Sequence, residues 1–213
     1  MNKLGWTLLS LVAVALLLGV GTATAQNLAP DYDYGVGYFT NANASGAPSA
    51  QLRLTNDGFA PTEPGISEEV VGLPENVCAS IYVFDTAEEM QECCSCQITP
   101  DGYLDLSVNT NLINNILDHG TKPTRGIIKV LSTYVPPGGV CNPTEGDLES
   151  GVKGWLTHVQ KGATAGTFSL TETPLTDSYL SETEFFDNLL YTCSFVQSLG
   201  TSTGVCSCAD AGD

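Results

Sequence analysis

Positively charged residues are scarce in this chain. Lys and Arg together number 7, against 24 Asp and Glu, so the 213 residues carry a formal net charge of −17 at pH 7. Proteins that bind nucleic acids need clustered Lys and Arg to displace counterions from phosphates, and anionic lipid surfaces attract basic segments in the same way. The composition therefore argues against nucleic acid and against an anionic membrane surface as partners.

Long apolar runs are also rare. The run at residues 8–20 follows Lys3 and precedes the small residues Ala23-Thr24-Ala25, an order typical of a secretory signal peptide with its cleavage site. After residue 25, no apolar run approaches the roughly 20 residues that span a bilayer. We therefore expect a signal peptide at residues 1–25, a single domain at residues 26–213, no membrane insertion, and a secreted or cell-surface location.

Side chains that commonly perform catalysis are few. The chain has 2 histidines; we interpret His119 as the C-terminal cap of a helix and His158 as a half-exposed strand residue. Residues 200–204 fit the G-x-S-x-G pattern of a nucleophilic serine, but that motif needs a later histidine and none follows. Carboxylate pairs could hydrolyse glycosides, but among 24 acidic residues their presence is uninformative. We predict no catalytic residues and no enzyme activity.

Cysteine, in contrast, is abundant and even in number, at 8. Behind a signal peptide, such a set indicates a disulfide framework formed in an oxidising compartment. The alternative is a thiolate metal site, but zinc sites usually separate paired cysteines by about two residues, and the spacers here are shorter. We therefore predict no metal site. Neighbouring Cys93 and Cys94 should bond different partners, and the sequence does not choose among the pairings. The predicted disulfide residues are Cys78, Cys93, Cys94, Cys96, Cys141, Cys193, Cys206 and Cys208.

Acidic side chains offer a few oxygen ligands at short spacing, which is the ligand type that calcium prefers. None of these places completes the calcium loop of an EF-hand. We therefore expect a solvated acidic surface and no cofactor, with weak calcium binding as the alternative. The places are Asp31 with Asp33, Asn56 with Asp57, and Glu145 with Asp147; separately, Asn43-Ala44-Ser45 is a sequon for N-glycosylation.

Alternation of apolar and polar residues is the dominant pattern. Helical spacing with cap residues predicts a C-terminal helix at residues 181–199, with Cys193 in its apolar stripe, and short helices at residues 86–94 and 112–117. We therefore expect a mostly β fold, an antiparallel β-sandwich of about seven strands with a C-terminal helix and short helical insertions, stapled by disulfides. The predicted strands lie near residues 32–38, 50–54, 78–84, 104–108, 126–135, 152–160 and 167–173.

Four blocks of the sequence are distinctive. They are Cys-Ala-Ser-Ile-Tyr-Val-Phe-Asp at residues 78–85, Glu-Met-Gln-Glu-Cys-Cys-Ser-Cys at residues 89–96, Thr-Pro-Asp-Gly at residues 99–102 and Gly-Val-Cys-Ser-Cys at residues 204–208. Together they resemble a group of uncharacterised secreted bacterial proteins. The resemblance covers most of the chain after residue 25 but not residues 32–38. It implies a shared fold and shared disulfides, and it implies no activity because none is established for the group.

A β-rich, disulfide-bonded, acidic chain with an aromatic strand near its N-terminus is typical of extracellular structural proteins. We predict a non-enzymatic secreted structural or cell-surface protein. A strand near a free terminus can pair with the open edge of a neighbouring subunit, and head-to-tail contacts that do not close build filaments. The predicted intermolecular strand consists of Tyr32, Tyr34, Val36 and Tyr38; the alternative is that these residues pair within their own sandwich.

Two other functions stay open. A sandwich presents loops at its ends, so one alternative is an extracellular binding module for glycan, calcium or a protein partner, with residues 59–74 and 136–147 as its binding loops. A secreted hydrolase is the other alternative, and it is the least favoured.

Overall fold

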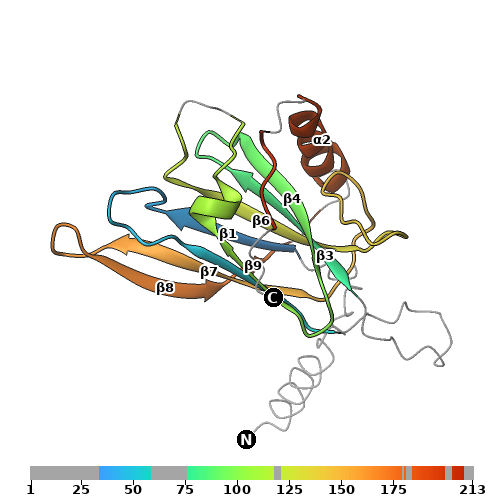
Figure 1. Ribbon diagram of the computed structural model, residues 1–213, viewed down its shortest axis with the longest axis horizontal. Coiled ribbons are helices and arrows are strands. Elements are labelled where there is room, and N and C mark those ends of the chain that lie inside the picture. Colours follow the sequence, from blue (N-terminus) through green and yellow to red (C-terminus); the bar gives the residue numbers. More distant parts are fainter. Residues whose placement is uncertain are drawn as a thin grey trace, which may run out of the picture. The chain divides into compact units, whose positions relative to one another are not determined.

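The computed structural model describes residues 34–58, 76–117, 121–178, 180, 184–199 and 203–208. Within them, nine strands form two antiparallel sheets (Figure 1). The first sheet has the order β4 (Met90–Ile98), β3 (Val77–Phe84), β6 (Arg125–Tyr134), β1 (Tyr34–Thr40) and β9 (Thr176–Asp177). The second has the order β5 (Tyr103–Ser107), β2 (Gln51–Asn56), β7 (Val152–Lys161) and β8 (Phe168–Pro174). The prediction of a mostly β fold with two antiparallel sheets is confirmed.

The main core lies between the inner faces of the two sheets. Leu52 and Leu54 of β2 are fully buried while Arg53 between them is not, which is the alternation of a sheet covered on one face. Strand β3 is instead buried along nearly its whole length, because the first sheet is covered on both faces. Ile81 belongs to the core between the sheets, and Tyr82 belongs to a second core beneath the C-terminal helix.

The C-terminal helix lies on the outer face of the first sheet. A π-helical segment, η2 (Glu184–Leu190), continues into α2 (Tyr191–Ser198), so the predicted helix is confirmed for the part of it that the structure describes. Its predicted apolar stripe is buried in the second core at Phe185, Leu189, Cys193 and Val196, while Phe186 is exposed. Among the described residues, no helix is both long and apolar enough to cross a bilayer.

The predicted helix at residues 86–94 is wrong, because this segment forms a turn and the first half of β4. Asp85 Oδ1 accepts hydrogen bonds from the backbone amides of Ala87, at 2.8 Å, and Glu89, at 3.1 Å. The bond from Ala87 is one that an N-cap makes, but the Asp85 amide also donates to the Glu89 carbonyl at 3.1 Å and closes a β3–β4 hairpin. Glu88 takes a φ of +65° there, which a helix does not allow.

The predicted helix at residues 112–117 is displaced. The structure places a π-helical turn, η1, at Val108–Leu112, and the Ser107 hydroxyl accepts a hydrogen bond from the Thr110 amide at its start. Residues 118–120, which include the expected cap residue His119, lie outside the described residues. After this turn, backbone groups bond distant parts of the chain instead of continuing a helix: the Leu117 amide donates to the Gln91 carbonyl at 3.0 Å, and the Asn115 carbonyl accepts the Gly204 amide at 2.6 Å.

Three glycines let the two sheets approach each other where the chain passes from β8 to β9. Leu175, between these strands, inserts against Gly35 and Gly37 of β1 and Gly154 of β7. A Cβ atom at Gly37 would lie 2.7 Å from Leu175 Cδ2 and 2.8 Å from Leu156 Cδ2. Because glycine weakens a strand, Gly35 and Gly37 reduce the strand signal of β1 in the sequence, and close packing explains why glycine is there.

We expect Gly37→Ala to lower the free energy of unfolding by about 2 kcal/mol, because overpacking a well-filled site costs roughly 1–3 kcal/mol. Urea unfolding measures this loss. In the double variant Gly37→Ala/Leu175→Ala, the loss should be smaller than the sum of the two single losses, because the shorter side chain makes room. Strict additivity would show that Leu175 is not the residue that excludes a side chain at Gly37.

Candidate functional site

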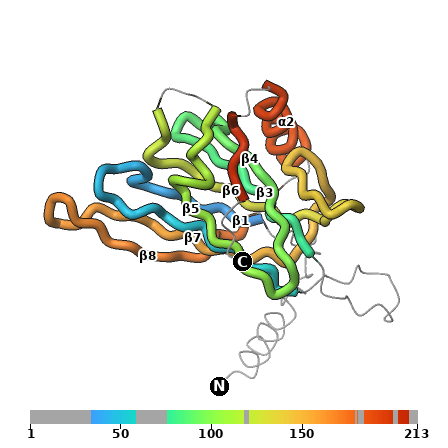
Figure 2. Tube along the Cα trace, in the orientation of Figure 1, coloured from blue at the N-terminus to red at the C-terminus, as the bar shows by residue number. Residues whose placement is uncertain are grey.

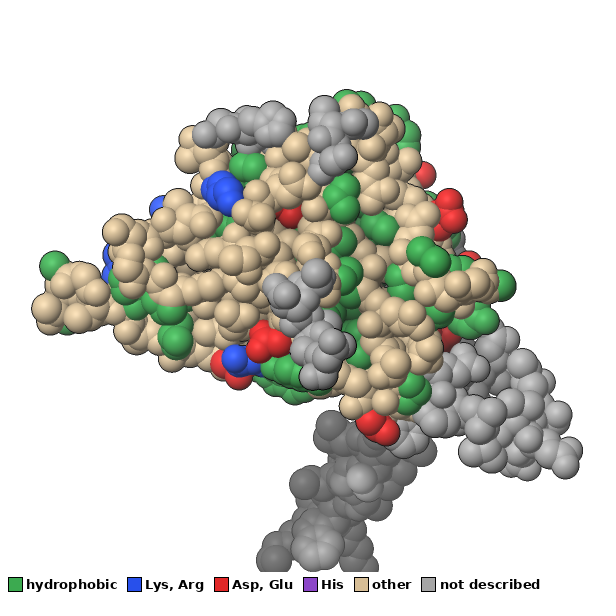
Figure 3. All heavy atoms as spheres, viewed as in Figure 1, with side chains coloured by type: hydrophobic (Ala, Val, Ile, Leu, Met, Phe, Trp, Pro, Cys, Tyr) green, Lys and Arg blue, Asp and Glu red, His purple; other side chains and the backbone are tan. Residues whose placement is uncertain are grey.

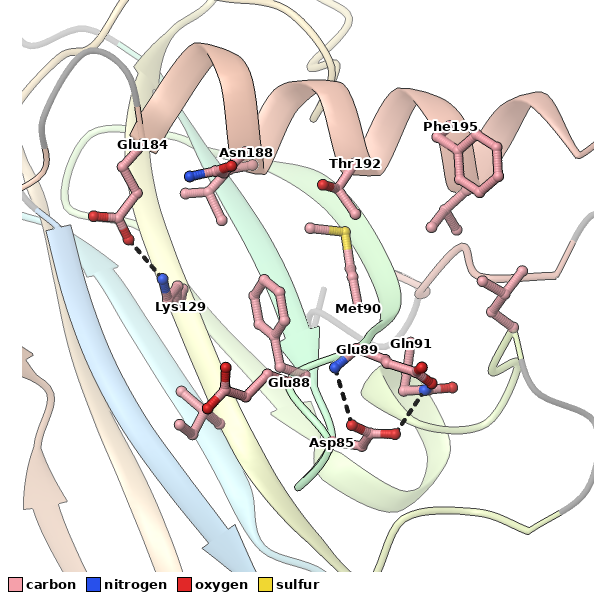
Figure 4. Close-up of a pocket in the computed structure, with 15 residues that line it drawn as sticks. Asp85, Glu88, Glu89, Met90, Gln91, Lys129, Glu184, Asn188, Thr192 and Phe195 are labelled. Carbon is pink, nitrogen blue, oxygen red and sulfur yellow. Dashed lines mark hydrogen bonds and ion pairs between the residues drawn. The ribbon is translucent and has the colours of Figure 1, made fainter.

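A groove of about 810 Å³ lies between the C-terminal helix and one end of the first sheet (Figure 4). One wall is the helix flank that carries Glu184, Asn188, Thr192 and Phe195. The other wall is the turn between β3 and β4, with Ile127 and Lys129 of β6 beside it. The apolar side chains that line the groove are Phe84, Met90, Leu117, Ile127, Leu189, Phe195 and Val196.

The turn supplies the acidic side of this groove. Asp85 is engaged in the turn itself, since its Oδ2 also accepts a hydrogen bond from Gln91 Nε2 at 2.9 Å (Figure 4). The carboxylates of Glu88 and Glu89 have no hydrogen bond or ion pair with any described residue. The left-handed backbone of Glu88 stores strain of the order of 1 kcal/mol. Two unpaired negative charges thus border an apolar groove.

A single basic residue, Lys129, lines the groove. Its Nζ donates to Glu184 Oε1 at 2.7 Å (Figure 4). Burial acts against the charge of Lys129, but hydrogen bonds to Glu184 and Tyr34 outweigh burial and raise its pKa. Lys129 therefore stays charged and paired within the protein, and it does not neutralise Glu88 or Glu89.

Glu92 of β4 is a buried carboxyl group close to this region. Its side chain is fully buried; Oε1 accepts a hydrogen bond from the Asn115 amide at 2.6 Å, and Oε2 has no partner among the described residues. Burial raises the pKa of Glu92 to about 7, although the Asn115 amide and the charge of Lys122 act to lower it. No pattern in the sequence marks Glu92, because its partner lies 23 residues away.

All eight cysteines form disulfides, as predicted. The pairs are Cys78–Cys141, Cys93–Cys193, Cys94–Cys206 and Cys96–Cys208. Cys93 and Cys94 bond different partners, and Cys193 fastens the C-terminal helix to β4. The segment around Val205 lies parallel to β4 at Cys93 (Figure 2), so the two Cys-x-Cys motifs pair as two extended segments. A spacer of one residue places both cysteines of each motif on the same side of an extended segment, so it suits two disulfides side by side.

The sulfur atoms do not form a metal site. Those of Cys94, Cys96 and Cys208 lie within 4.8 Å of one another. Each belongs to a disulfide, and a metal needs the thiolate form of cysteine. The thiolate alternative is therefore excluded while the disulfides are intact.

The predicted intermolecular strand lies partly in β1, because Tyr34, Val36 and Tyr38 belong to β1 and Tyr32 lies outside the described residues. β1 pairs with β6 along its whole length. On its other side, Gly35 and Val36 pair with β9, and no described strand pairs with Gly37–Thr40. Within one chain, these residues thus pair in their own sheet. Self-association through them stays a prediction.

The structure describes one of the two histidines, His158. His119 and residues 200–202 lie outside the described residues. His158 is 3% exposed, which corrects the half-exposed interpretation. Its ring stacks on Tyr38 with the ring centres 4.3 Å apart, and its Nε2 lies 2.6 Å from Thr173 Oγ1. The strand is buried at this point because β1 packs across β7.

Of the predicted calcium ligands, the structure describes Asn56, Asp57, Glu145 and Asp147. Asp31, Asp33 and residues 59–74 lie outside the described residues. Asn56 is buried, with its Oδ1 accepting the Gly58 amide and its Nδ2 donating to the Ile98 carbonyl, so it stabilises a turn. Glu145 and Asp147 are exposed in the loop at residues 136–147. Weak calcium binding stays an alternative.

Comparison with known proteins adds a structural likeness. No family model and no curated protein matches this chain. The fold is similar to the crystal structure of Thermotoga maritima 1070, with a TM-score of 0.41 and 14% sequence identity over 70% of this chain and 97% of that chain.

Proposed function

We propose that this chain is a non-enzymatic, secreted structural or cell-surface protein that associates with copies of itself by pairing the edges of its second sheet. The secretory pattern at residues 1–25 and the four disulfides support an oxidising, extracellular location. One observation carries the self-association: both edges of the second sheet, β5 and β8, offer backbone groups that no described residue binds.

The outer edge of β8 follows from its hydrogen-bond pattern. In an antiparallel pair, alternate residues direct both backbone groups to the partner strand. The Gly162 amide donates to Thr167 and the Leu175 amide donates to Gly154, each at 2.8 Å, which fixes the alternation along β8. The amides of Phe168, Leu170 and Glu172 therefore point away from β7. No described residue accepts a hydrogen bond from them.

The outer edge of β5 follows in the same way. The Val108 amide donates to Ala50 at 2.8 Å, and the Asn56 amide donates to Gly102 at 3.1 Å. The backbone groups of Tyr103 and Asp105 therefore point away from β2. A row of unpaired backbone groups is a template for a strand of another chain.

The charges of the two edges favour association. Asp105 of β5 and Glu172 of β8 are the single acidic residues of these strands, and both form ion pairs with Arg53 of β2, so little negative charge opposes pairing of the two edges. Neither strand contains a lysine, the residue that commonly blocks edges. Because the second sheet has four antiparallel strands, β5 of one copy can lie antiparallel to β8 of the next. This head-to-tail contact does not close, and it extends into a filament.

Leu170→Pro tests the proposal. Proline removes the outward amide of Leu170 while leaving the bonds between β8 and β7, since proline is tolerated on the open side of edge strands. We expect the purified wild-type protein to form filaments or oligomers in negative-stain images and light scattering, with assembly increasing at higher salt as the acidic copies repel less. Leu170→Pro should remain monomeric, and Leu170→Ser, which keeps the amide, should assemble. A wild-type protein that is monomeric at every concentration and salt would exclude the proposal.

A further inference from the structure

We propose that the groove between the C-terminal helix and the β3–β4 turn binds a short cationic amphipathic segment of another secreted protein. In this arrangement an apolar side chain of the segment packs on Phe84 and Ile127, which are accessible from solvent, and flanking Lys or Arg side chains pair with Glu88 and Glu89. The inference goes beyond self-association and does not depend on it, since the groove lies on the first sheet and the open edges belong to the second.

The apolar surface of the groove gives the first argument. Seven of its lining residues are apolar, and two of these, Ile127 and Phe195, are 41% and 54% exposed. Large apolar side chains on the surface of a secreted protein are tolerated singly, but a contiguous set around a groove marks a binding site. An amphipathic segment that lays its apolar face in such a groove is a common recognition mode.

The charge around the groove gives the second argument. Asp85, Glu88, Glu89 and Glu184 line it, and Lys129 is committed to Glu184. Glu88 and Glu89 carry negative charge with no partner in the described part of the chain. Lys and Arg are few and scattered on the face shown in Figure 3. The complement of an apolar groove with unpaired carboxylates is an apolar side chain next to positive charges.

The backbone of Glu88 gives the third argument. Its φ of +65° is a conformation that glycine or asparagine adopts more easily. In Figure 4, the Glu88 side chain extends into the groove beside Lys129. The hairpin turn accounts for the backbone, since the Glu88 amide donates to the Asp85 carbonyl at 3.4 Å, but a glutamate side chain is not needed for it. A strained position that holds an unpaired charge at a binding surface is a feature of functional sites.

A second copy of this chain does not supply the cationic segment. Three of its 7 basic residues lie within residues 122–129, where they flank apolar residues. Residues 125–129 of that stretch are in β6, which pairs with β1 on one side and β3 on the other. The one cationic amphipathic stretch of the sequence is therefore built into the first sheet, and the partner has to be a different protein.

Fluorescence anisotropy with a labelled peptide of alternating leucine and lysine pairs tests this site on the full chain. We expect Glu88→Gln/Glu89→Gln to weaken peptide binding about tenfold, from the loss of two surface charge contacts. Glu145→Gln, at an exposed carboxylate in the loop at residues 136–147, is the matched control and should leave the affinity unchanged. A peptide with serine in place of leucine should bind at least tenfold more weakly than the leucine peptide.

Two further variants keep the test decisive. Asn188→Arg places a positive charge on the exposed helix flank of the groove and should abolish peptide binding without lowering Tm. Glu88→Gly relieves the left-handed backbone and should weaken binding while Tm stays level or rises. A fall in Tm for Glu88→Gly would assign this residue to fold stability and overturn its role in binding.

Three other outcomes contradict the proposal. The first is no binding of the leucine–lysine peptide to the wild type even at low salt. The second is an equal loss of affinity in the double variant and in Glu145→Gln, which would mean that net charge alone attracts the peptide. The third is that Asn188→Arg prevents self-association of the protein, which would place a second copy in the groove.

Discussion

Replacing both Cys93 and Cys193 with alanine is expected to lower the free energy of unfolding by about 4–5 kcal/mol. The Cys93–Cys193 disulfide closes a loop of 100 residues, and loops of that length correspond to about 4.7 kcal/mol in the chain-entropy account of cross-links. Both cysteines are fully buried in the core beneath the C-terminal helix, so their loss also leaves unfilled space. Urea unfolding of the oxidised double variant measures the total loss.

The matched control is the Cys78→Ala/Cys141→Ala variant. That disulfide closes a loop of 63 residues, for which the chain-entropy account gives nearly the same value, roughly 4 kcal/mol. Cys141, however, lies in a partly exposed loop rather than in a core. The variant lacking Cys93–Cys193 should therefore lose more stability, and backbone amides of α2 should exchange hydrogen faster in it alone. Equal losses and equal exchange in the two variants would show that the helix holds its place without this disulfide.

The β fold follows from local patterns, and so does part of the disulfide framework. The alternation at Leu52, Arg53 and Leu54 predicts a strand with one face buried, and the burial pattern of β2 confirms it. Neighbouring cysteines cannot easily bond each other, so the different partners of Cys93 and Cys94 also follow from the sequence. The full pairing does not, because the bonds join residues up to 112 positions apart.

The wrong prediction of a helix at residues 86–94 comes from a sequence pattern that is compatible with two local structures. An aspartate that accepts the amide two residues later is compatible with a helix N-cap and with a tight hairpin turn. After Asp85, the disulfides of the three cysteines in β4 favour the hairpin over the helix. A strand places Cys94 and Cys96 on one face, opposite Cys206 and Cys208, and turns Cys93 toward the helix. A helix cannot meet all three partners at once, so tertiary pairing overrides the local cap.

The groove could not be predicted from spacing. Its ion pair joins Lys129 and Glu184, which are 55 residues apart, and its walls come from three strands, a turn and a helix. The sequence shows the acidic Glu88-Glu89 pair and the apolar strand before it. It does not show that the C-terminal helix packs beside them and forms the other wall of the groove. Open strand edges are equally invisible, because whether β5 or β8 has a neighbour is decided by sheet order.

Glu92 should make the protein less stable as the pH rises toward neutrality. Burial raises the pKa of Glu92 to about 7 in the folded state from an ordinary value of 4.5, so the folded state binds this proton more tightly than the unfolded state. The stability linked to the proton is fully present below about pH 4.5 and is lost as the pH rises through about 7. The difference corresponds to about 3 kcal/mol at most.

Glu92→Gln isolates this effect, because glutamine stays neutral and keeps an oxygen that accepts the Asn115 amide. We expect the variant to match the wild type near pH 4 and to exceed its unfolding free energy by about 2–3 kcal/mol near pH 8, as measured by urea unfolding at each pH. Repulsion among the many other carboxylates also weakens the fold as pH rises, but it acts on both proteins and cancels in the difference. Glu145→Gln, at an exposed carboxylate, should instead follow the wild-type curve. Parallel curves for Glu92→Gln and the wild type would show that Glu92 is ionised in the folded protein at neutral pH, and that its buried oxygen has found a partner that stabilises the charge.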